Sequence, residues 1–129
     1  MEEKVLGLDK AIELLEKAIE KLEEKYEIEL TGEEIIDEGE DIIGKEVIIK
    51  LCRKNEDIEI NLGGWVELDR RIDEITEEPY IWFQGILEID TRYDKNVKFG
   101  GGYYEDYRVF KAEYDLYENK WRGFWVENL

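Results

Sequence analysis

The chain has 129 residues, the usual size of one domain, and 43% of them are hydrophobic, which is enough to fill a single core. Its 18 basic and 35 acidic residues give a net charge of -17, a field that repels phosphate backbones and anionic lipid headgroups. We therefore expect one domain over residues 1–129 that binds neither nucleic acid nor a membrane surface directly. The sequence contains no His and no Ser, which excludes Ser-His and Cys-His nucleophiles and His-ligated metal centres.

The N-terminal part of the chain predicts a helix followed by a strand. The helix is expected from Leu8 to Tyr26, because apolar residues recur there at alternating spacings of four and three. These residues form one stripe: Leu8, Ile12, Leu15, Ile19, Leu22 and Tyr26. From Tyr26 to Leu30 the period becomes two, which is typical of a strand with one wet face. The residues Thr31–Glu34 fit a capping box, which predicts a short helical turn over Ile35–Glu38.

The middle of the chain predicts a hairpin and a second helix. Glu46–Lys54 and Ile58–Leu62 alternate as paired strands on either side of a three-residue connection. Six apolar residues of this hairpin are expected to face inward: Val47, Ile49, Leu51, Ile58, Ile60 and Leu62. Gly63 and Gly64 interrupt the pattern, and helical spacing of Leu68, Ile72 and Ile75 then predicts a short helix that ends before Pro79.

Three further strands complete the prediction, over Tyr80–Tyr93, Tyr107–Tyr117 and Trp121–Glu127. Six antiparallel strands and one leading amphipathic helix indicate an α+β domain, in which the N-terminal helix packs on a curved antiparallel sheet. A small closed β-barrel with the helix as a plug or lid is the alternative.

Cysteine content and the N-terminal residues bear on location. A single cysteine, Cys52, cannot form an internal disulfide, and the first residues have neither a basic nor an apolar signal region. These features predict a reducing, cytoplasmic location, and Cys52 is expected to be packed rather than reactive. Few thermolabile side chains and many Glu, Lys and Ile are typical of heat-adapted proteins.

A run of carboxylates without any Lys or Arg extends from Glu27 to Asp41. The segment Asp37–Asp41 lacks the ligand order of an EF-hand, so we expect no metal site there. Such a run is either a solvated face or a surface that imitates nucleic-acid phosphates toward a basic protein. The candidate partner-binding carboxylates are Glu33, Glu34, Asp37, Glu38, Glu40 and Asp41.

Aromatic residues give a second signal, because 14 of the 16 lie between Tyr80 and Trp125. Strict alternation in the last three strands places one set of residues on the face turned away from the helix: Trp82, Glu88, Glu113, Asp115, Tyr117, Trp121 and Trp125. Exposed aromatic patches usually mark contacts. We expect this face to be covered by the second helix or a loop, to form a homodimer, or to bind another protein or a cationic ligand.

The glycine-rich segment 99–107 carries Tyr103, Tyr104 and Tyr107, a composition that adaptable binding loops use, although a plain hairpin connection has the same composition. Three functions remain. The first is an acidic interaction protein, without catalytic residues, cofactor or metal, that binds and inhibits or sequesters a basic partner. Nucleic-acid mimics, immunity proteins and anti-defence proteins are of this type. The others are a small-ligand binder with an aromatic pocket between sheet and helix, and a hydrolase that uses carboxylates alone.

Overall fold

The computed structural model describes residues 4–32, 34–52, 59–72, 75, 77–90 and 103–127, and for residues 52, 89–90, 103–108 and 124–127 only the backbone. The described elements are α1 (Leu8–Lys25), β1 (Glu27–Leu30), β2 (Ile36–Gly39), β3 (Ile42–Cys52), β4 (Glu59–Asp69), β5 (Tyr80–Asp90), β6 (Tyr103–Asp115) and β7 (Lys120–Glu127). No helix in this part of the chain has both the length and the apolarity that a membrane span requires.

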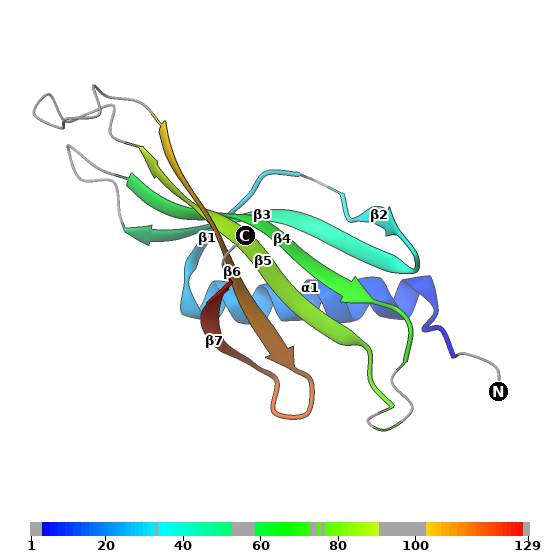
Figure 1. The fold of residues 1–129 in the computed structure, drawn as a ribbon. Coiled ribbons are helices and arrows are strands. Elements are labelled where there is room, and N and C mark those ends of the chain that lie inside the picture. The colour runs from blue at the N-terminus through cyan, green and yellow to red at the C-terminus, as the bar shows by residue number, and fades with distance from the viewer. Residues whose placement is uncertain are drawn as a thin grey trace, which may run out of the picture.

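The strands form one antiparallel sheet in the order β1-β3-β4-β5-β6-β7, and β2 pairs with β3 on the same side as β1. Figure 1 shows α1 on one side of this curved sheet, where it runs across the strands. The predicted α+β architecture is therefore confirmed. β1 and β7 lie at opposite ends of the strand order, so the sheet is open and the alternative of a closed barrel is wrong.

The core lies between α1 and the sheet. The helix contributes its buried residues Ala11, Leu15, Ala18, Ile19 and Leu22. The sheet contributes Val47, Ile49, Val66, Leu68, Ile81 and Phe83, all fully buried. The predicted apolar stripe is correct in its centre, but Leu8 at its beginning is 49% exposed. The buried face of α1 is thus rotated toward its two alanines.

Two glycines allow the sheet to bend tightly around this core. Gly64 and Gly85 pair with each other in β4 and β5, on the face that carries Val47 and Phe110. A methyl group on Gly64 would lie 2.0 Å from the carbonyl oxygen of Gln84, which is too close for any real contact. On Gly85 it would lie 2.7 Å from the ring of Phe83. The close approach of the two strands here requires both residues to lack a side chain.

Two local predictions are wrong. The residues around Ile36 form strand β2 rather than a helical turn, because they pair with β3. The helix predicted after Leu68 is also absent from the described residues, since β4 continues through Gly63 and Gly64 to Asp69. Pairing with β3 and β5 on both sides determines the structure of Leu68, which overrides its helical spacing.

The hairpin of β3 and β4 is confirmed, and its alternation is interrupted once. The register shifts between Lys50 and Cys52. Leu51, predicted to face inward, is instead 45% exposed, whereas Ile49 and Leu62 before the shift are buried as predicted. A single extra residue is enough to exchange the faces of a strand.

Candidate functional site

The sheet surface turned away from α1, which we call the outer face, carries the predicted aromatic and acidic side chains of β5 and β6. In β5, Ile81 and Phe83 are fully buried against the core, whereas Trp82 and the other side chains that alternate with them are only partly buried. In β6, Ala112 and Tyr114 are buried and Glu113 lies between them on the opposite side. The predicted alternation of these two strands is therefore confirmed.

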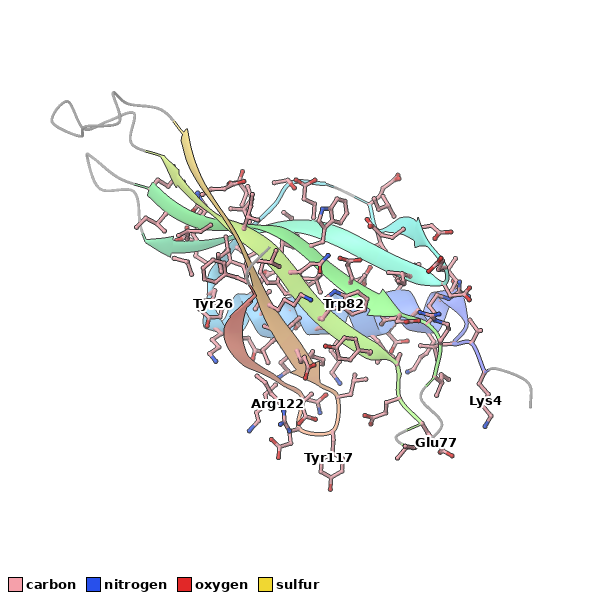
Figure 2. All side chains as sticks on the ribbon, viewed as in Figure 1. Lys4, Tyr26, Glu77, Trp82, Tyr117 and Arg122 are labelled. Carbon is pink, nitrogen blue, oxygen red and sulfur yellow. The ribbon has the colours of Figure 1, made fainter. Side chains whose placement is uncertain are left out.

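Trp82 is near the middle of the outer face (Figure 2). Its ring stacks on that of Tyr80 with 5.2 Å between the centroids and 22° between the planes. The hydroxyl of Tyr80 donates a hydrogen bond of 2.5 Å to Glu113 Oε1, and Glu113 pairs with Trp82 across β5 and β6. The two rings and the carboxylate thus form a connected group, in which the orientation of Tyr80 is fixed from both sides.

Glu67 is the buried carboxylate of the outer face, with only 7% of its surface exposed. It pairs with Trp82, and Oε1 accepts a hydrogen bond of 3.1 Å from Gln84 Nε2. Burial raises the pKa of Glu67 above its usual value, repulsion from Glu38 raises it further, and the hydrogen bond from Gln84 opposes both. Glu67 was not among the predicted site residues, because it lies in the segment predicted to follow the break at Gly63.

Trp65 was missed for the same reason. It is a partly buried residue of β4 that pairs with Glu46 and Gln84, so it lies on the outer face. Beside Trp65 lies a surface depression of about 370 Å³, and Gly63 is one of the residues that line it. We call this depression the glycine hollow; it is lined by Glu46, Ile48, Gly63, Gly64, Trp65, Gln84, Gly85, Ile86, Glu88 and Val109.

The described residues of the predicted acidic set are all exposed; these are Glu34, Asp37, Glu38, Glu40 and Asp41, which we call the acidic edge. Glu33 lies outside the described residues. Asp37 and Asp41 also hold the local backbone. Asp37 Oδ1 accepts a hydrogen bond of 2.8 Å from the amide of Gly39, and the carbonyl of Asp41 accepts one of 2.8 Å from Arg70. Glu40 and Asp41 form the turn between β2 and β3, with φ of 50° and 62°.

The acidic edge and the outer face are joined at Gly44. A methyl group on Gly44 would lie 3.2 Å from Cγ of Glu67 and 3.4 Å from Cγ of Glu38. The two carboxylate side chains therefore lean over the same glycine, one from the acidic edge and one from the outer face. Because Glu67 in turn pairs with Trp82, the acidic edge adjoins the aromatic side chains of the outer face through Glu38 and Glu67.

The prediction that Trp121 lies on the outer face is wrong. Trp121 is 7% exposed and belongs to the core, where its indole Nε1 donates a hydrogen bond of 2.8 Å to the carbonyl of Ala18 in α1. The register of β6 and β7 shifts between Lys111 and Glu113, so that β7 contains one extra residue. This bulge reverses the alternation that the sequence analysis had assumed for the whole strand.

Asp115 is the last residue of β6 and lines a hollow with Tyr80 and Glu113, whereas Tyr117 lies in the turn between β6 and β7 rather than within the outer face. Asp115 Oδ1 accepts hydrogen bonds of 3.0 and 3.1 Å from the amides of Tyr117 and Glu118, and Oδ2 accepts one of 2.8 Å from Arg122. The hydrogen bond from Arg122 is the main cause that lowers the pKa of Asp115. Tyr117 is 87% exposed and points away from the protein (Figure 2).

Four of the remaining candidates, Tyr103, Tyr104, Tyr107 and Trp125, have no described side chains. The backbone of Trp125 pairs with Lys111, and Tyr103, Tyr104 and Tyr107 belong to the first half of β6, but their side chains lie outside the described residues. The same holds for the side chain of Cys52. Glu88 is described: it is partly buried on the outer face, and its carboxylate oxygens lie over Gly63.

Comparison of the chain with protein-family models, with curated proteins and with solved structures gave no match. Within the described residues, no three His, Cys, Asp or Glu side chains are grouped so that they could hold a metal ion. A second hollow, of about 260 Å³, lies near Tyr80, Glu113 and Arg122. Glu67, the carboxylate with a raised pKa, lines neither this hollow nor the glycine hollow.

Proposed function

We propose that this protein is an acidic interaction module that binds, and thereby inhibits or sequesters, a basic protein such as a nucleic-acid-binding protein. The observation that carries the proposal is the continuity of the outer face with the acidic edge through Gly44 and Glu67. A surface of this kind combines aromatic rings with carboxylates. Aromatic residues often contribute most of the binding energy of an interface, and both rings and carboxylates attract a cationic partner.

Charge favours a basic partner over a second copy of the chain. The net charge is -17, and the outer face carries Glu46, Glu67, Glu88 and Glu113. A homodimer through this face would bring like charges together, which costs free energy, whereas a basic surface is attracted and oriented by the same field.

The ligand-binder alternative has less support. A pocket between sheet and helix would require space there, but this interface is filled by fully buried side chains of both elements, among them Leu15, Leu22 and Phe83. Trp121 closes the same interface near Ala18. The partly exposed aromatic rings instead lie on the outer face, where a large partner can reach them.

The test is affinity capture of the basic partner from cells that contain this protein, with variants chosen for equal charge. Four carboxylates of the acidic edge are reversed to Lys in one variant: Glu34, Asp37, Glu38 and Glu40. Four exposed carboxylates of α1 are reversed in the matched control: Glu13, Glu16, Glu20 and Glu23. We expect the first variant to lose the captured protein, identified by mass spectrometry, and the control to retain it.

Equal loss in both variants would show that only the total charge matters and would contradict a defined surface. Capture of an acidic or neutral protein that survives both reversals and high salt would contradict the proposal. Because folding defects imitate binding defects, the melting temperature of each variant must first match that of the unmodified protein.

A further inference from the structure

We infer that the glycine hollow is the socket for one long cationic side chain, arginine or lysine, of the basic protein partner. This inference rests on the proposed function and deepens it, since it assigns to one part of the outer face the chemical group that it holds. The hollow lies on β3, β4, β5 and β6, so that its walls belong to four neighbouring strands.

Gly63 contributes no side chain to this hollow, and the fold does not require that absence. Gly63 has no left-handed φ, so other residues can adopt its conformation. The three atoms nearest to a methyl group there would all belong to the carboxylate of Glu88, with Oε1 at 2.9 Å, which is the mobile end of a side chain. Gly64 and Gly85 differ, because added methyl groups would collide with backbone atoms. Close contact between the strands explains those two glycines, whereas at Gly63 the carboxylate of Glu88 takes the place that a side chain would fill and so lies in the hollow.

The lining suits a cation with an aliphatic stem. Trp65 offers an aromatic ring, and Glu46 and Glu88 offer two carboxylates, which together attract an ammonium or guanidinium group. Three aliphatic side chains, Ile48, Ile86 and Val109, can cover the methylene groups of the stem. No Lys or Arg is among the described residues that line the hollow.

Size and charge favour such a group over other ligands. The volume of about 370 Å³ is at the lower end of the usual range for ligand pockets, which runs from roughly 300 to 1,000 Å³. An anion would be repelled by the two carboxylates, and a neutral apolar group would gain no electrostatic attraction from them. A cationic side chain instead interacts favourably with all three parts of the lining: its charged end with the ring and the carboxylates, and its methylene groups with the aliphatic side chains.

The test uses the full-length protein and three capped five-residue peptides that differ only in a central arginine, lysine or citrulline between glycines and alanines. Citrulline has nearly the shape of arginine but no charge. In amide-detected NMR titrations we expect the arginine and lysine peptides to shift the signals of Gly63, Gly64 and the Trp65 indole. The citrulline peptide should leave these signals unchanged.

Two variants localise the binding. Gly63→Ala displaces the carboxylate of Glu88 from the hollow, and it should weaken the arginine peptide about fivefold, the upper end of the scale of one surface ion pair. Glu46→Gln removes a charge from an exposed rim position and should weaken it about threefold, the scale of one surface ion pair. Glu16→Gln on the exposed side of α1 is the matched control, which should bind as the unmodified protein does.

Equal shifts with citrulline would overturn the cationic socket, as would signals that move on α1 or the acidic edge while those of the hollow stay still. Unchanged affinity in both Gly63→Ala and Glu46→Gln would do the same. If a basic partner is captured but the peptides do not reach the hollow, only this inference fails. If the peptides bind but no basic protein is captured, the proposed function fails.

Discussion

Two tryptophans that the sequence makes equivalent have different roles in the structure. Trp121 is buried and donates a hydrogen bond to α1, whereas Trp82 is partly exposed and stacks on Tyr80. Trp121→Ala should lower the free energy of unfolding by about 3–5 kcal/mol, the usual cost of truncating a large buried aromatic residue. Trp82→Ala should cost about 1 kcal/mol, which is the average cost of single substitutions in proteins. Urea denaturation of both variants measures the difference, and equal losses would contradict the placement of Trp121.

Glu67 predicts a pH dependence of stability. Its folded pKa is raised above the value of 4.5 that an unperturbed carboxyl has, mainly by burial. The folded state therefore binds the proton more tightly than the unfolded state. The free energy of unfolding should decrease as the pH rises from near 4.5 through the folded pKa.

Glu67→Gln removes the ionisable carboxyl group and keeps an oxygen that can accept the hydrogen bond from Gln84. We expect the variant to be more stable than the unmodified protein at pH 7 and to lose this advantage at pH 4. Denaturation curves at both pH values, with Glu16→Gln on α1 as control, measure the effect. An advantage of the same size at both pH values would mean that ionisation of Glu67 does not oppose folding.

At the scale of elements, the same substitution at two positions of α1 tests which side of the helix is core. Leu15 is fully buried and Leu8 is 49% exposed. Leu15→Ala should lower the free energy of unfolding by about 2–5 kcal/mol. Leu8→Ala should change it by less than about 0.5 kcal/mol, as surface substitutions usually do. Similar losses at both positions would show that the helix is rotated differently on the sheet.

Neighbouring glycines of β4 provide a second comparison. Gly64→Ala should lower the free energy of unfolding by about 1–3 kcal/mol or more, because the methyl group would collide with the backbone of β5. Gly63→Ala should stay within about 1 kcal/mol of the unmodified protein, since only Glu88 must move and the unfolded chain loses entropy. Thermal melting measures both, and a severe loss at Gly63 would place that residue among the bending positions.

Sequence periodicity predicted the elements correctly where burial alone sets the pattern, and it failed where a bulge or a pair of glycines alters that pattern. α1 and the inner residues of β5 were predictable because burial imposes a single period on each. Trp121 and Leu51 were not, because bulges reverse alternation and leave no unique mark in the sequence. Glu67 and Trp65 follow Gly63 and Gly64, which were predicted to interrupt the strand although β4 passes through them. These two residues were therefore missing from the predicted site.

At the scale of the whole molecule, the acidic side chains differ in how far they lie from the outer face, and so in how they act on a partner there. Exposed carboxylates of α1 lie on the opposite side of the sheet from the outer face, so they add to the long-range field without touching a partner there. The acidic edge lies beside the outer face and acts at shorter range. Salt can therefore separate the effect of the total charge from that of the acidic edge. At physiological ionic strength, salt screens interactions between exposed charges that lie more than about 8 Å apart.

Charge and aromatic contacts should therefore affect different rate constants of the proposed binding reaction. Association with the basic partner is expected to slow steeply as salt rises, because long-range attraction steers the encounter. Reversal of Glu34, Asp37, Glu38 and Glu40 should mainly reduce the association rate constant. Trp82→Ala should instead raise the dissociation rate constant, since a contact that forms only in the complex is lost. Surface-based binding kinetics at several salt concentrations measure both constants. An affinity that does not change with salt or with the reversed charges would exclude steering by the acidic edge, and with it the imitation of nucleic-acid phosphates.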